Sequence, residues 1–97
     1  WQSGPALPVS RSNLSAAIDR HGRIFVLGGS TPSGSALVTN VDVYNTASRT
    51  WSRAGALRSG RFEALATATP DGRIWLLGGY NALGDPLRTM QVFTPAA

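Results

Sequence analysis

The sequence contains no cysteine and only one histidine, His21, which excludes several kinds of chemistry. Without cysteine there is no disulfide framework, no thiolate zinc site and no cysteine nucleophile. No run of about 18 apolar residues is present, so neither a membrane-spanning helix nor a membrane partner is expected. We expect no catalytic residue, metal or cofactor, and we interpret His21 as a solvated turn residue. The cellular compartment is left open, because a lack of cysteine fits either side of a membrane.

The chain also contains no lysine, since all nine basic residues are arginine, and with five acidic residues the net charge is +4. Arginine forms planar, bidentate contacts with carboxylates and phosphates, so an acidic partner would suit this composition. The alternative is that arginine replaces lysine throughout a sequence rich in alanine and glycine. The arginines form no run or basic stripe, so we expect no nucleic-acid partner.

The sequence does contain an internal repeat with a period of 50 residues. The segment 21–29, which reads His-Gly-Arg-Ile-Phe-Val-Leu-Gly-Gly, returns at 71–79 as Asp-Gly-Arg-Ile-Trp-Leu-Leu-Gly-Gly. The same shift aligns Trp1 with Trp51, Leu7 with Leu57, Arg11 with Arg61 and Leu37 with Leu87, and a shift of 49 then aligns Tyr44 with Phe93. We therefore divide the chain into the repeats 1–50 and 51–97. A period of this length is typical of propeller repeats.

Each repeat contains candidates for antiparallel strands. The predicted strands are 14–18, 23–27, 40–44, 65–69, 73–77 and 89–93, together with outermost strands that begin at Trp1 and Trp51. The runs 23–27 and 73–77 are apolar throughout, which is typical of strands covered on both faces. Glycine pairs follow these two runs, where the backbone must bend or approach another backbone closely. The fold class is therefore all-β, with two four-stranded antiparallel sheets per chain.

The order of a glycine pair, an aromatic residue after an alternating strand, and a tryptophan several residues later resembles the kelch repeat. The residues that carry the resemblance, and that we expect to be structural, are Gly28, Gly29, Gly78, Gly79, Tyr44, Trp1 and Trp51. Phe93 departs from the pattern, because it stands where the family has tyrosine, and the second repeat ends before its own tryptophan. The resemblance implies four-stranded blades of a β-propeller. It implies no single activity, because this architecture serves binding scaffolds, oxidases and sugar-modifying enzymes alike.

Two blades cannot close a ring, so the edges of these sheets are expected to meet further blades. Residues from Trp1 are predicted to form the outermost strand of a neighbouring blade, and the sheet that ends at Phe93 lacks such a strand. We therefore expect copies of the chain to complete one another, with six blades from three chains as the favoured ring. The alternative is a two-blade excerpt of a larger enzyme, an oxidase or a sugar-modifying enzyme, whose catalytic residues lie elsewhere.

Chain reversal at each turn places the longer connections 5–13, 30–39, 55–61 and 80–88 at one end of the sheets, which we call the long-loop face. The candidate ligand-binding residues on this face are Arg11, Asn13, Arg58, Arg61, Tyr80 and Arg88. Arg11 and Arg61 each precede an innermost strand, so we expect a ring of guanidinium groups that binds a carboxylate or an acidic peptide. In the alternative, each arginine bonds to a loop carbonyl or an acid such as Glu63 and holds neighbouring blades together.

Overall fold

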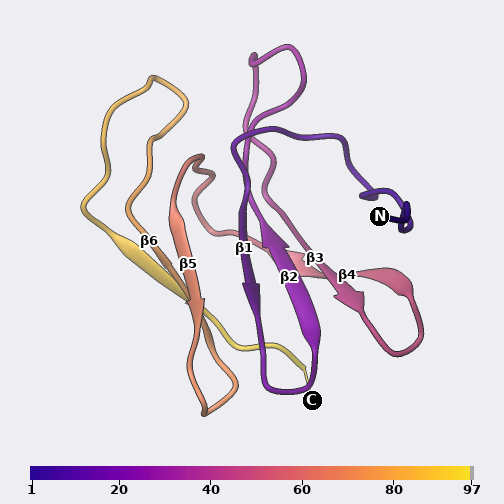
Figure 1. Ribbon diagram of the computed structural model, residues 1–97. Coiled ribbons are helices and arrows are strands. Elements are labelled where there is room, and N and C mark those ends of the chain that lie inside the picture. Colours follow the sequence, from indigo (N-terminus) through magenta and orange to yellow (C-terminus); the bar gives the residue numbers. More distant parts are fainter. Residues whose placement is uncertain (97) are drawn as a thin grey trace.

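A computed structural model describes residues 1–96, which form two antiparallel β-sheets side by side (Figure 1). Blade 1 has four strands in the order β1 (Ser15–Ile18), β2 (Arg23–Leu27), β3 (Asn40–Asn45) and β4 (Thr50–Ala56). Blade 2 has three strands, β5 (Leu65–Ala68), β6 (Ile74–Leu77) and β7 (Met90–Phe93). The predicted all-β class is confirmed. Across residues 1–96 there is no helix that is long and apolar enough to cross a membrane.

The blades and the sequence repeats are offset by one strand. β4 opens the repeat 51–97, yet it pairs with β3 and completes blade 1, with Trp51 opposite Tyr44. The long connections lie at one end of both blades and the short turns at the other (Figure 1). The offset joins consecutive repeats through a shared sheet.

The segment 1–7 forms no strand within the chain. The strand predicted from Trp1 belongs to a neighbouring blade, so it stays a prediction. Trp1 is fully exposed, so it does not pack between sheets. The segment is attached through Pro5, whose carbonyl accepts a hydrogen bond of 3.1 Å from Trp51 Nε1. A strand needs an edge to pair with, and this segment pairs with no sheet edge among the described residues.

The glycine pairs end the second strand of each blade in a left-handed backbone conformation, with φ of 66° and 97° at Gly28 and Gly29. A Cβ atom at Gly29 would lie 2.6 Å from the Ser12 carbonyl oxygen, and one at Gly79 would lie 2.6 Å from that of Phe62. Only glycine fits both the conformation and the space. The turns thereby bring the long loops against the segments that precede β1 and β5.

The core lies between the two blades. Because side chains alternate along a strand, each blade presents one set to its neighbour and the other set away from it. Blade 1 contributes Phe25, Leu27 and Val41, and blade 2 contributes Ile74 and Leu76, all of them buried. Backbone bonds also join the blades, from Gly29 N to Arg61 O (3.0 Å) and from Glu63 N to Asn13 O (2.9 Å). The two blades therefore form one packed unit.

The sheet faces directed away from this core, which we call the outward faces, differ between the blades. The register places on the outward face of blade 2 the side chains of Leu65, Thr67, Trp75, Leu77, Met90 and Val92. Four of these are exposed large apolar residues: Leu65, Leu77, Met90 and Val92. The outward face of blade 1 carries Ala16, Ile18, Ile24, Val26, Asp42 and Tyr44. Neither outward face is covered by another sheet in the described part of the chain.

Candidate functional site

Arg11 lies inside blade 1 and has a fully buried side chain. Its guanidinium donates from Nη1 to the carbonyl oxygens of Gly28 and Asn40, each at 3.2 Å, and forms an ion pair with Asp42 through Nη2. Asp42 is itself 2% exposed. These bonds tie the glycine turn after β2 to the start of β3, so the charge of Arg11 is neutralised inside the blade.

Arg61 makes the equivalent contacts in blade 2 but has no acidic partner among residues 1–96. Its Nη1 donates to Gly78 O at 3.0 Å and to Thr89 O at 2.9 Å, and its Nη2 donates to the Thr89 hydroxyl at 3.2 Å. The residue is 2% exposed, and its Nε has no hydrogen-bond partner in the described part of the chain. Burial lowers the pKa of the Arg61 guanidinium, because an apolar environment disfavours the charged form.

Gln91 stands in blade 2 where Asp42 stands in blade 1, and its side chain points elsewhere. Its Oε1 accepts hydrogen bonds from the backbone N–H groups of Arg58 (3.0 Å) and Ser59 (3.4 Å), and its Nε2 donates to Ser59 O at 2.9 Å. The residue therefore fastens β7 to the connection between the blades and leaves Arg61 without a counter-ion.

The structure does not bring Arg11 and Arg61 together in an open pocket, so the expected ring of guanidinium groups is not formed by these two residues. Their contacts correspond to the alternative in which each arginine bonds to a carbonyl or an acid and has a structural role. Two details differ from that expectation. The acid is Asp42 and not Glu63, and the guanidinium bonds lie within one blade and do not cross between blades. An acidic residue between the two valines of strand 40–44 was the sequence signal for a buried ion pair.

The long-loop face contains a cavity of about 380 Å³ between the loops 30–39 and 80–88. Its lining is neutral and mixed, with hydroxyl and apolar groups: Asn13, Ser30, Gly34, Ser35, Ala36, Leu37, Phe62, Ala82, Leu83 and Gly84. Asn13, a predicted binding residue, is thus part of this cavity. Tyr80, another, stacks on the lining residue Phe62 with ring centroids 5.5 Å apart.

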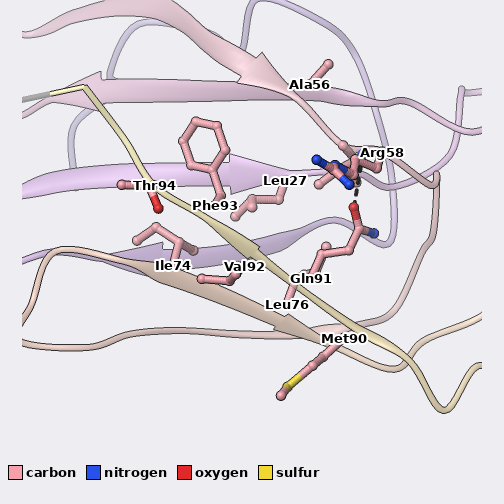
Figure 2. Close-up of a pocket in the computed structure, with 11 residues that line it drawn as sticks. Leu27, Ala56, Arg58, Ile74, Leu76, Met90, Gln91, Val92, Phe93 and Thr94 are labelled. Carbon is pink, nitrogen blue, oxygen red and sulfur yellow. Dashed lines mark hydrogen bonds between the residues drawn. The ribbon is translucent and has the colours of Figure 1, made fainter.

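A larger groove of about 470 Å³ runs beside β7 (Figure 2). One wall is β7 and its continuation to Thr94, and the other is the segment 56–58, where Arg58 lies. Leu27, Ile74 and Leu76 form its floor, so the groove opens onto the core between the blades. Arg88 lines neither hollow and is exposed. The six candidate residues are therefore dispersed among the blade interiors, the two hollows and the surface.

The described residues contain no group of three or more His, Cys, Asp or Glu side chains that could hold a metal ion. His21 is exposed in the turn between β1 and β2, where its N–H donates to Asp19 Oδ1 at 2.9 Å.

A family model described as the Kelch motif matches residues 11–58. The chain is a kelch-repeat protein. Similar proteins include a galactose oxidase of Gibberella zeae, which is 33% identical over 84 residues, or 80% of this chain and 12% of the oxidase. An F-box/kelch-repeat protein of Arabidopsis thaliana is 30% identical over 76 residues, or 76% of this chain and 20% of that protein. This kelch-repeat chain thus spans a fifth or less of the length of these curated relatives.

Proposed function

We propose that this chain is a structural and binding module of a β-propeller, whose outward blade faces pack against further kelch blades. One observation carries the proposal. The outward face of blade 2 is, by the internal repeat, the equivalent of the blade 1 face that blade 2 buries. Trp75 corresponds to Phe25 and Leu77 to Leu27, and both blade 1 residues are almost completely buried by this packing.

The same equivalence applies to the outward face of blade 1. Its Ile24 and Tyr44 correspond to Ile74 and Phe93, which pack on blade 1 in the observed core. The two faces that pack against each other in the core therefore each have an open equivalent: the outward face of blade 2 and the outward face of blade 1. A second copy can stack on the first by repeating a contact that the chain already makes, and this head-to-tail contact closes into a ring.

The energetic argument favours such stacking. Complete burial of one large apolar side chain contributes about 1.5–3 kcal/mol, and the outward face of blade 2 leaves four of them exposed. Propeller rings have about 4 to 8 blades. Because each chain supplies two blades, we propose six blades from three chains.

We further propose that the long-loop face binds a polar or acidic partner. The cavity beside Asn13 and the exposed arginines Arg58 and Arg88 support this assignment, since hydroxyl groups and guanidinium groups pair with carboxylates. Binding should weaken with salt, because the exposed charges are screened. An acidic peptide titrated against wild type and the Arg58→Ala/Arg88→Ala variant, at low and high salt, tests the proposal. Equal affinity of the two proteins would overturn it.

The assembly is tested by light scattering of the wild-type chain and of Leu77→Arg, which places a charge on the outward face of blade 2. We expect a mass of several chains for wild type and a smaller mass for the variant, because a charge on this face opposes its packing against another blade. Ser48→Arg, which adds the same charge in the exposed turn between β3 and β4, is the matched control and should assemble normally. A folded wild-type particle of single-chain mass would refute assembly.

The match to galactose oxidase favours a second candidate, in which these two blades belong to a larger enzyme. Catalytic groups would then lie in other parts of that enzyme, and the outward faces would pack on its other blades. This candidate expects the 97-residue chain to remain incompletely folded at every concentration. Near-ultraviolet circular dichroism across a dilution series separates the two candidates, because a self-assembling chain gains fixed aromatic packing as its concentration rises.

A further inference from the structure

We infer that the free edge of β7, with the groove beside it, is a strand-binding site that accepts residues 1–7 of a second copy as the fourth strand of blade 2. The inference deepens the proposed function, because it specifies a contact through which two copies join. It concerns a sheet edge and is separate from the packing of the outward faces.

The first observation is the edge itself. Within residues 1–96, β7 pairs with β6 alone, whereas its counterpart β3 pairs with β2 on one side and β4 on the other. An unpaired edge presents a row of N–H and C=O groups that can add a strand from another chain. The groove of about 470 Å³ lies along this edge, and Figure 2 shows Phe93, Leu27 and Ile74 around it.

The second observation identifies the strand that fits. Residues 51–57 form β4 and its continuation, and residues 1–7 are their repeat equivalents, with the same residue at Trp1 and Trp51, Ala6 and Ala56, and Leu7 and Leu57. In blade 1 the indole of Trp51 lies against the ring of Tyr44, with centroids 5.1 Å apart. Phe93 is the equivalent of Tyr44, so the groove already holds the aromatic partner for Trp1.

The pairing in blade 1 also fixes the register. Tyr44 is opposite Trp51, Val43 opposite Ser52 and Asp42 opposite Arg53, with an irregularity beyond that point. By equivalence Phe93 lies opposite Trp1, Val92 opposite Gln2 and Gln91 opposite Ser3. Pro5 then falls beyond the irregularity on an edge strand, where a proline is tolerated.

The third observation is that segment 1–7 of the same chain lies on the wrong side to fill the groove. The Pro5 carbonyl bonds to the indole of Trp51, which faces outward from blade 1 beside Tyr44, whereas blade 2 packs on the opposite face of blade 1. Figure 1 shows the N-terminal segment beside β4, with β5 and β6 across the molecule. Residues 1–6 are exposed, so they are accessible to another copy.

The test uses engineered cysteines, because the native chain has none. Chains carrying Gln2→Cys are mixed with chains carrying Val92→Cys under mild oxidation. We expect a disulfide-linked pair that contains one chain of each kind, in several-fold excess over the product of Gln2→Cys with Gln91→Cys. In that control the two side chains lie on opposite faces of the sheet. Equal yields from both mixtures would overturn the proposed register.

The variant Val43→Cys/Ser52→Cys provides the positive control, because it places two cysteines at the equivalent pair within one chain. If this variant forms its disulfide and the Gln2/Val92 mixture does not, the inference is wrong. A Gln2→Cys/Val92→Cys double variant that forms its disulfide only within a single chain would also overturn it, because the chain's own segment would then occupy the groove.

A binding measurement tests the strand-binding site independently of the cysteine variants. A dye-labelled peptide of residues 1–7 is titrated against the Trp1→Ala chain and followed by fluorescence anisotropy. We expect saturable binding, and at least tenfold weaker binding of the same peptide with alanine in place of tryptophan. No binding, or equal binding of the two peptides, would refute the site.

The outcomes separate this inference from the proposed function. Assembly by light scattering without the Gln2/Val92 disulfide would mean that copies join by their outward faces, and the strand-binding site would be abandoned. Peptide binding to a wild-type particle of single-chain mass would show that the edge accepts this strand but not from a second copy, and would overturn the occupant that we infer.

Discussion

The two repeats build nearly the same scaffold around a buried arginine but neutralise its charge differently. In both blades the guanidinium donates to a glycine carbonyl after the second strand and to a carbonyl at, or one residue before, the start of the third. Blade 1 adds the buried carboxylate of Asp42, whereas Gln91 at the same place in blade 2 bonds across to the backbone of Arg58 and Ser59. In both repeats the arginine therefore links two backbone carbonyls, and the first repeat adds an ion pair to this link.

The repeats also differ in what covers them. The face of blade 1 that contains Phe25 is buried by blade 2, and the equivalent face of blade 2 is open. Similar residues thus have different environments within one chain. Substitutions at equivalent positions therefore measure how much stability a covering blade contributes.

The largest expected effect is that of Phe25→Ala, compared with Trp75→Ala. Truncation of a buried aromatic side chain costs about 3–5 kcal/mol. Trp75 is half-buried and its Nε1 donates to the Thr69 hydroxyl at 2.9 Å, so its loss should cost less than half as much. Urea unfolding at a fixed protein concentration gives both values. Equal costs at the two positions would mean that the two faces are equally covered in solution.

The second comparison is Arg11→Met with Arg61→Met. Loss of Arg11 leaves the buried carboxylate of Asp42 unpaired, and we expect a cost of about 3 kcal/mol, at the low end for breaking a buried pair. Loss of Arg61 leaves only neutral acceptors and removes a buried cation that lacks a counter-ion, so a cost of about 1 kcal/mol is expected. The same unfolding experiment measures both. A larger cost at Arg61 would show that its carbonyl bonds outweigh the ion pair.

The strands were predictable from sequence because their patterns are local. The strand 23–27 was predicted with the bounds of β2, and 14–18, 40–44 and 65–69 each differ from the observed strand by one residue. Apolar runs and the glycines that end them decide these limits within a few neighbouring residues. The repeat spacing likewise indicated that the two halves of the chain form similar blades.

The environment of the arginines was not predictable in the same way. The acceptors of Arg11 lie 17 and 29 residues away, and Asp42 lies 31 residues away, so the bonds exist only once the sheet has formed. The strand expected from Trp1 stays a prediction for a related reason, since it needs the edge of a neighbouring blade and segment 1–7 pairs with no strand of its own chain among the described residues. Both hollows also arise between segments of different repeats.

A smaller effect is expected from Gln91→Ala, matched with Asn45→Ala. Each side chain receives two backbone N–H bonds, but those of Gln91 join β7 to the connection between the blades, whereas those of Asn45 remain within one turn. Both variants should lose about 1 kcal/mol of stability. Only Gln91→Ala should speed hydrogen exchange at the amides of Arg58 and Ser59. Unchanged exchange at these amides would show that Gln91 does not bind the connection in solution.

The smallest expected effect is the pH dependence that distinguishes Asp19 from Asp71. Burial alone would raise the pKa of Asp19, but bonds from the N–H groups of Arg23 and His21, and the Arg23 guanidinium, outweigh it and lower the pKa below its ordinary value. A carboxylate with a lowered pKa in the folded state contributes stability above its ordinary pKa, and this stability is lost as the pH falls through the folded value. At Asp71 the bond from the Thr69 hydroxyl lowers the pKa, but the carboxylate is exposed, so solvent screens its contribution to stability. Asp19→Asn should therefore flatten the loss of thermal stability between about pH 5 and pH 2 more than Asp71→Asn does, as measured by melting temperatures across that range. If Asp19→Asn retained the wild-type pH dependence, the bonds around the Asp19 carboxylate could not be a source of acid sensitivity.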